Sequence, residues 1–474
     1  MKYITILCAF LGSFASHGQA AEAPAKPNII FILADDLGYG DLGCFGQARI
    51  KTPHLDRMAT EGIRFTQAYA GATVCAPSRG VLMTGRHTGH GMVRGNAGLQ
   101  NPLAQSLRAT DTTVASILQK AGYATALIGK WGLGDAGDAE PGLPRRHGFE
   151  YFFGYLNQHH AHNYYPEYLW RNETKVKLSN VVPNVDARGA GMASERRDYA
   201  ADLFTDEALK WVRENKARPF FLYFSTTLPH ANNEAKQKGM EVPELGDYQN
   251  LDWPEPQKGH AAMITRMDRD VGQLLALLKE LNIDKNTLVI FTSDNGPHRE
   301  GGNNPDFNRS SGPLRGIKRD HYEGGIRVPT IARWPAQMPA GKVSDAAWYF
   351  ADVLPTFAEL AGATTPAGVD GVSILPTLLG KSQAALKDRF LYWEFHENGF
   401  KQAARWGDWK AVRNYLDDPI ELYDLSKDLG ETNNVAAQQS KVVARFEEHF
   451  KTARTDSPDW PIKKGQRRPS VAKP

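Results

Sequence analysis

The stretch NIIFILA, residues 28–34, decides the fold of this chain. It is a continuous apolar run without alternation, which is typical of a strand buried on both faces in a parallel sheet. It ends abruptly in Asp35 and Asp36. Open α/β sheets bind ligands at the carboxyl ends of their strands, although two adjacent aspartates could also form a plain polar turn. A second strand with the same kind of ending favours a ligand site.

That second strand is TLVIFTS, residues 287–293, which is followed by Asp294, Asn295 and a glycine. Asp-Asn-Gly could form a hairpin turn by itself. Two buried strands that end in carboxylate and amide groups would instead bring these oxygens to one edge of a sheet. An all-oxygen ligand set suits calcium or magnesium better than zinc. The sequence therefore predicts a hard-cation site at the ends of the two strands.

Helix and strand patterns alternate along the first three quarters of the chain. Apolar spacing and apolar runs predict helices over 112–121, 199–216 and 261–281 and strands over 124–128 and 220–225. This alternation predicts a doubly wound α/β domain over 21–380, with a large mixed sheet flanked by helices.

From about residue 381 short strands with turn signals between them replace this pattern. They are predicted over 389–395, 410–413 and 421–425, and a helix is predicted over 442–453. The expectation is a smaller C-terminal antiparallel sheet plus one helix over 381–461, followed by a basic tail over 462–474.

Charge and targeting signals limit the partners and the compartment. A net charge of +3 is close to neutral for 474 residues, so charge alone indicates no nucleic-acid partner. No apolar run is long enough to span a bilayer, so no transmembrane anchor is expected. Residues 1–20 combine Lys2, an apolar run and small residues before Ala20, and they are interpreted as a signal peptide. The protein is expected to be exported, to the periplasm or the extracellular space.

The stretch CAPSRGVLMTGR, residues 75–86, carries the chemistry. Pro77 would lie in the first turn of a helix, which places Cys75 at a helix N-terminus, where an anionic group is favoured. Such a cysteine could be a thiolate nucleophile, a buried structural thiol or a modified residue. The stretch resembles the first signature of the type I sulfatases, an arylsulfatase A-like family of the alkaline-phosphatase-like superfamily. In that family a maturation enzyme oxidises the cysteine to formylglycine, whose hydrated aldehyde is the nucleophile.

The resemblance extends along most of the chain. GYATALIGKW (122–131) is similar to the second signature, LPH (228–230) to the stretch with the active-site histidine, and LRGIK (314–318) to that with the sulfate-binding lysine. The implied catalytic residues are Cys75, Arg79, Lys130, His230 and Lys318, and the implied ligands of one Ca²⁺ are Asp35, Asp36, Asp294, Asn295 and residue 75. The sequence departs from the pattern at Gly132, where the family usually has a histidine that contacts the nucleophile.

Candidates for substrate contacts are less sharply defined. His298 could compensate for the histidine missing at position 132, contact the substrate or be an ordinary loop residue. The stretch 155–171 is dense in aromatic and histidine residues, which suits stacking on sugar rings. A transition-metal site and simple packing are the alternatives for its three histidines. The predicted substrate-binding residues are His298, His90, Arg94, His160, His162 and Arg315.

The resemblance implies hydrolysis of a sulfate monoester. The aromatic and histidine-rich stretch favours a sulfated carbohydrate over a steroid or a small aryl ester, with the galactose and N-acetylgalactosamine series as candidates. Action at chain ends is the expected mode. Two other functions stay open. One is a phosphate or phosphonate monoester hydrolase of the same superfamily, and the other is a catalytically silent protein that binds sulfated glycans.

Overall fold

A ten-stranded sheet forms the centre of the computed structural model, which describes residues 26–97, 101–135, 141–397 and 399–463. Its five central strands run parallel, antiparallel pairs follow on both sides, and the outermost pair β11–β2 is again parallel. In spatial order the strands are β11 (Lys342–Ser344), β2 (Ile63–Phe65), β10 (Thr330–Arg333), β9 (Thr287–Ser293), β1 (Asn28–Ala34), β8 (Phe220–Ser225), β4 (Ala124–Lys130), β5 (Tyr151–Tyr155), β6 (Tyr168–Arg171) and β7 (Thr174–Lys177).

The burial of strand β1 explains why its sequence is a continuous apolar run. All seven of its residues are buried, and successive side chains enter two different hydrophobic cores. Ile29, Phe31 and Leu33 belong to the core on one face of the sheet, and Ile30 and Ile32 belong to the core on the other. Because both faces are covered, alternation with polar residues would place polar groups in a core.

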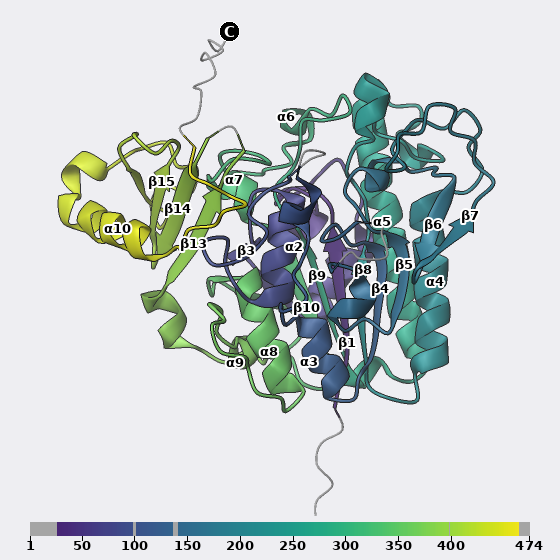
Figure 1. The fold of residues 1–474 in the computed structure, drawn as a ribbon, viewed down its shortest axis with the longest axis horizontal. Coiled ribbons are helices and arrows are strands. Elements are labelled where there is room, and N and C mark those ends of the chain that lie inside the picture. Colours follow the sequence, from purple (N-terminus) through teal and green to yellow (C-terminus); the bar gives the residue numbers. More distant parts are fainter. Residues whose placement is uncertain (1–25, 98–100, 136–140, 398, 464–474) are drawn as a thin grey trace, which may run out of the picture.

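Helices cover both faces of the sheet (Figure 1). One face carries α1 (Pro53–Glu61), α4 (Ala200–Asn215) and α5 (Glu255–Glu280), and the other carries α2 (Cys75–Thr84), α3 (Val114–Lys120) and α8 (Val353–Leu360). Helix α3 begins after Thr113, whose side chain forms a capping box with Ser116. Shorter helices are α6 (Pro305–Asn308), α7 (Glu323–Ile326) and α9 (Leu375–Leu378).

A second, antiparallel sheet lies beside the large one, at the left in Figure 1. Its strands are β13 (Phe390–Phe395), β14 (Lys401–Trp406), β15 (Trp409–Arg413) and β16 (Glu421–Asp424), and α10 (Ser440–Thr452) packs against it. A two-stranded pair, β3 (Ala68–Tyr69) with β12 (Trp348–Tyr349), runs between the two sheets.

The predicted architecture is confirmed, with differences in detail. Helix α5 begins at Glu255, before the predicted start at residue 261. The prediction missed its first turns because they are polar and show no apolar spacing. Strand β14 was not expected, since KQAARW has little β-branched or aromatic content. The predicted signal peptide over 1–20 and the tail beyond residue 463 lie outside the described residues, and the division at residue 380 remains a proposal. Within the described ranges, the helices are too short or too polar to cross a membrane.

Candidate active site

The acidic residues predicted as metal ligands lie together at the carboxyl ends of β1 and β9. Asp35 and Asp36 follow β1, Asp294 and Asn295 follow β9, and all four are fully buried. Parallel pairing continues to the last residues of both strands, so the two turns leave the sheet side by side. Asp36 adopts a left-handed conformation (φ 66°), which aspartate tolerates better than most residues, and its N–H donates to Asp294 Oδ1 at 3.1 Å.

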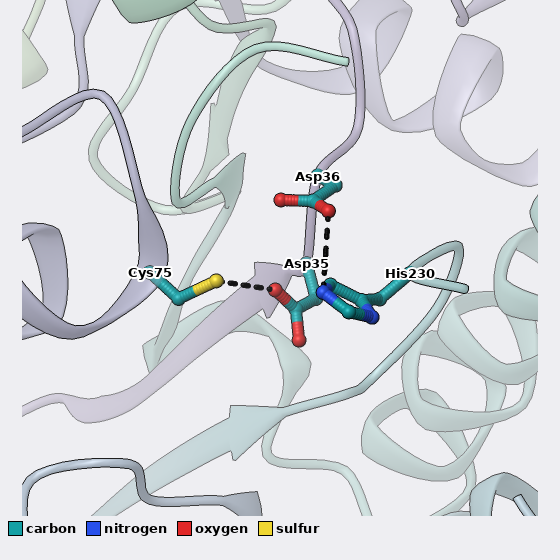
Figure 2. A group of neighbouring side chains, drawn as sticks. All are labelled: Asp35, Asp36, Cys75 and His230. Atoms are coloured by element: carbon teal, nitrogen blue, oxygen red, sulfur yellow. Dashed lines mark hydrogen bonds and ion pairs between the residues drawn. The ribbon is translucent and has the colours of Figure 1, made fainter. Parts of the chain in front are cut away.

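Cys75 is the first residue of α2 and points at the end of β1. Its Sγ donates to Asp35 Oδ1 at 3.3 Å. Figure 2 shows this contact and His230 reaching Asp36 from the other side; ligand atoms of these four residues lie within 4.8 Å of one another. Burial and the neighbouring Asp35 raise the pKa of the Cys75 thiol well above its usual value. A resting thiolate is therefore disfavoured, and the sulfur marks where the oxygens of a formylglycine would lie.

Two buried cations hold these carboxylates in place. Arg79, one turn after Cys75, donates to Asp294 Oδ2 at 2.8 Å and to the Lys130 carbonyl at 3.0 Å. Lys130, the last residue of β4, donates through Nζ to Asp35 Oδ2 at 2.7 Å. Burial alone would lower the pKa values of both cations, but Asp294 for Arg79 and Asp35 for Lys130 outweigh it. Both side chains therefore stay charged.

A third cation joins Asp36 to the histidine. Lys318 Nζ lies 2.8 Å from Asp36 Oδ2, 3.1 Å from Glu300 Oε2 and 3.2 Å from His230 Nε2. His230 Nδ1 lies 2.7 Å from the carbonyl of Ala231, which can only accept, so Nδ1 carries the proton and Nε2 accepts from Lys318. Burial and Lys318 lower the pKa of His230 to about 3, so the ring is neutral in this arrangement.

The donor set fits a hard cation. Asn295 Nδ2 donates to Asp36 Oδ1 at 2.7 Å, whereas its Oδ1 is buried without a hydrogen-bond partner among the described residues. Burial and the nearby Asp35 raise the pKa of Asp294 to about 7, which shows how closely the carboxylates are crowded. An oxygen-binding divalent cation would relieve this crowding and take the orphaned amide oxygen.

A cavity of 140 Å³ opens beside Cys75. Every described residue of its lining is polar or charged, apart from the cysteine itself. The lining consists of Cys75, Asn96, Gln105, Gln158, His159, His162, Arg188, His230, Asn233, Glu300, Lys318 and Arg319. A larger hollow of 470 Å³ lies along the outer side of α4 and is lined by residues of that helix, none of which belongs to the site above.

The histidine-rich stretch divides between cavity and core. His162 lines the cavity, and its ring stacks on His230 with ring centroids 5.2 Å apart. His160, two residues earlier, is buried against Tyr155 and Tyr168 and does not belong to the cavity lining. Of the two predicted substrate contacts in this stretch, only His162 is therefore placed to meet a ligand.

His298 lies behind the cavity wall. Its Nε2 lies 3.2 Å from the Pro229 carbonyl, and its Nδ1 accepts from the N–H of Glu300 at 3.0 Å. Both ring nitrogens are thus engaged by the backbone. The geometry supports neither a substrate contact nor a replacement for the histidine absent at position 132.

The other three predicted substrate residues lie away from the cavity lining. His90 Nδ1 contacts Asp370 Oδ1 at 2.8 Å, and Arg94 forms a buried ion pair with Glu394 of β13 at 2.8 Å. Arg315 donates to a tyrosine hydroxyl of β16 at 3.1 Å. Arg94 and Arg315 thus connect the segments after α2 and around residue 315 to the C-terminal sheet, whereas His90 contacts the segment after α8.

Sequence reasoning missed several residues of the cavity wall. Glu300 bridges Lys318 and Arg319, with an oxygen 2.7 Å from the arginine, and Gln158 lies next to Gly132. Position in the chain could have indicated two of them, since Glu300 follows the β9 turn closely and Arg319 follows Lys318.

Comparison with known proteins decides the family. Residues 27–363 match the family model described as Sulfatase, and residues 317–456 match the model described as N-sulphoglucosamine sulphohydrolase, C-terminal. The chain belongs to the sulfatase family. This sulfatase is 33% identical to steryl-sulfatase of Mus musculus, over 84% of this chain and 72% of that protein. It is 31% identical to N-acetylgalactosamine-6-O-sulfatase of Bacteroides thetaiotaomicron, over 93% of this chain and 94% of that protein.

Solved structures agree with this membership. The crystal structure of Ps i-CgsB in complex with k-i-k-neocarrahexaose matches with a TM-score of 0.76 and 28% identity, over 92% of this chain and 95% of that one. A phosphonate monoester hydrolase of Agrobacterium radiobacter matches with a TM-score of 0.62 at 21% identity, which shows a shared fold alone. The resemblance to type I sulfatases and the predicted sulfuric ester hydrolase activity are confirmed.

Proposed function

We propose that this sulfatase removes sulfate from a sulfated carbohydrate, using a formylglycine formed from Cys75 and one Ca²⁺. The observation that carries the substrate class is the lining of the cavity. A sterol ester would need an apolar wall, whereas the described wall offers amide, imidazole, guanidinium and carboxylate groups that hydrogen-bond to sugar hydroxyls.

Similar proteins favour the same class and a galactose-type sugar. Relatives named N-acetylgalactosamine-6-sulfatase include that of Homo sapiens, which is 32% identical over 83% of this chain and 72% of that protein. The structure of Ps i-CgsB holds a neocarrahexaose. A cavity of 140 Å³ also suits a single sugar unit better than the middle of a polymer, which supports action at chain ends.

The residues of the site have separable roles in this proposal. The cation and the hydrated formylglycine supply a polarised oxygen nucleophile. Asp35, Asp36, Asp294 and the free Asn295 Oδ1 would hold the cation, and Arg79 fixes Asp294. Lys130, bound to Asp35, and Lys318, bound to Asp36, would neutralise charge that develops on sulfuryl oxygens in a site shielded from water.

Proton transfer to the leaving alcohol falls to the Lys318–His230 pair. Lys318 is protonated, because Asp36 and Glu300 raise its pKa against the effect of burial. His230 accepts from it through Nε2 and keeps its own proton at Nδ1, bound to the Ala231 carbonyl. In this arrangement Lys318 is the proton source, and His230 orients it.

Cellular context forms part of the proposal. Formylglycine requires a maturation enzyme as a transient partner, and the signal-like residues 1–20 support export to the periplasm or the extracellular space.

The test is release of inorganic sulfate by protein made together with a maturation enzyme. N-acetylgalactosamine 6-sulfate is expected to be a substrate, while estrone sulfate and the matching sugar phosphate turn over at least about 100-fold more slowly. Preferential turnover of the phosphate would support the hydrolase alternative. Binding of the sulfated sugar without sulfate release would support the silent binder.

A further inference from the structure

Gly132 leaves a space that a different residue fills. Gly132 has φ +78°, and a Cβ built on it would lie 2.2 Å from Gln158 Nε2 and 3.1 Å from Gln158 Cδ. The same point is 3.7 Å from Cδ of Arg79, the residue one turn after Cys75 on α2. The carboxamide of Gln158 thus occupies the place that a side chain at position 132 would take.

The register of the central sheet brings these two residues together. Strands β4 and β5 are paired in parallel up to Lys130 and Tyr155. The pairing continues beyond the strands, because the Trp131 N–H donates to the Tyr155 carbonyl and the Gly132 N–H donates to the carbonyl of the next residue, both at 2.9 Å. Gln158 follows two residues later and is delivered beside Gly132 at the carboxyl edge of the sheet, where ligands bind.

The side chain of Gln158 is fixed by one hydrogen bond and keeps a donor and an acceptor available. Its Nε2 donates to the Gly132 carbonyl at 3.3 Å, and Gln105 donates to the same oxygen at 3.3 Å from the other side. The second N–H and the Oε1 of Gln158 make no hydrogen bond among the described residues. Gln158 is nine-tenths buried and lines the same 140 Å³ cavity as Cys75.

We propose that Gln158 is a further catalytic residue. Its carboxamide, which occupies the space that Gly132 leaves open, hydrogen-bonds to the nucleophile at position 75. This inference rests on the proposed function. A carboxamide both donates and accepts but does not titrate, so it orients the nucleophile without taking its proton. The pH dependence of kcat is then set without residue 132 or residue 158.

The first experiment compares Gln158→Ala and Gln158→His with the parent enzyme, all converted at position 75, on N-acetylgalactosamine 6-sulfate. Gln158→Ala is expected to lower kcat by about 100-fold with KM changed less than about threefold, because a positioned hydrogen bond to a reacting group is lost. Gln158→His is expected to add an ionisation near pH 6.5 to the kcat profile, which a purely structural residue would not do.

Two controls separate contact from packing. Gln402→Ala removes another buried glutamine, in β14, and is expected to leave kcat unchanged with a similar change in Tm. Calorimetry of the same sugar sulfate with Cys75→Ser and Cys75→Ser/Gln158→Ala should give affinities within about threefold of each other, since the proposed contact is to the nucleophile and not to the sugar.

A third variant tests the shared space. Gly132→Ala places a methyl group against the carboxamide and should reproduce the loss in kcat, and the Gly132→Ala/Gln158→Ala double variant should be no worse than Gln158→Ala alone. Unchanged kcat in Gln158→Ala, or a loss of ligand affinity in the Cys75→Ser background, would overturn the inference while leaving the sulfatase activity intact. A parent enzyme that releases no sulfate would instead overturn the proposed function.

Discussion

Two of the buried charged clusters in the described part of the chain differ in how completely their polar atoms are paired. The first is the active-site cluster at the ends of β1 and β9. The second, here called the interface cluster, consists of Glu323 of α7, Lys410 of β15 and Glu431, all fully buried between the two sheets.

In the interface cluster every carboxylate oxygen has a donor. Glu323 Oε1 lies 3.0 Å from Lys410 Nζ, and its Oε2 accepts from Tyr69 at 2.7 Å and from Arg327 at 3.2 Å. Glu431 Oε1 lies 3.4 Å from the same lysine, and its Oε2 accepts from the Glu323 N–H at 2.6 Å. None of these residues lines the active-site cavity.

The active-site cluster is less complete. Asn295 Oδ1 has no hydrogen-bond partner among the described residues, and a cavity opens beside Cys75. Burial of charge is therefore common to both clusters, whereas an unpaired amide oxygen and a neighbouring cavity are found only in the cluster that we propose to be catalytic. Substitutions in the first cluster should change activity, and substitutions in the second should change stability.

The largest effect is expected at the nucleophile. Cys75→Ser made without a maturation enzyme carries an alcohol in place of formylglycine and should lose at least about 10⁴-fold in kcat, because the reacting group itself is absent. Its Tm should stay within a few degrees of the unconverted parent, since the hydroxyl can still donate to Asp35. Sulfate release and a thermal melt check both statements; a large fall in Tm would mean that Cys75 is chiefly structural.

In the interface cluster, Lys410→Met should destabilise the fold by about 3–5 kcal/mol, because Glu323 and Glu431 lose their shared cation. Activity per folded molecule should change less than about threefold. Urea unfolding followed by assays below the transition measures both, and loss of activity without loss of stability would contradict the division between the clusters.

Calcium removal should reduce activity by a smaller factor than loss of the nucleophile does. After treatment with EGTA, activity is expected to fall about 100-fold and Tm by several degrees, because the three carboxylates lose a shared cation. Added Ca²⁺ should restore both properties. Full activity in the chelated, calcium-free protein would show that the orphaned Asn295 oxygen does not mark a cation site.

The smallest expected effect is a pH dependence of the free energy of unfolding that arises in the interface cluster. Burial raises the pKa of Glu431 to about 7, above its unfolded value of 4.5, even though Lys410 opposes this. The protonated form is thus favoured in the folded state, so this contribution to stability is fully present below pH 4.5 and is lost as pH rises through 7. Between these limits the slope is at most about 1.4 kcal/mol per pH unit. Glu431→Gln should flatten this part of the curve of unfolding free energy against pH; an unchanged curve would exclude Glu431 as its source.

Sequence patterns predicted those features that are local along the chain. The runs that became β1 and β9 carry their burial and their acidic endings in adjacent residues, so the buried acidic cluster could be expected. Gln158 could not, because its place beside Gly132 depends on the β4–β5 register. Arg94 and Arg315 follow recognisable motifs, but only the fold shows that they face the C-terminal sheet.

The chemical state of residue 75 tests the central claim most directly. Protein made together with a maturation enzyme should give a tryptic peptide, residues 65–79, whose mass corresponds to formylglycine at position 75. Conversion in most of the molecules is the predicted result. An unmodified cysteine, in the presence of a maturation enzyme that converts a known sulfatase in the same cells, would contradict the account.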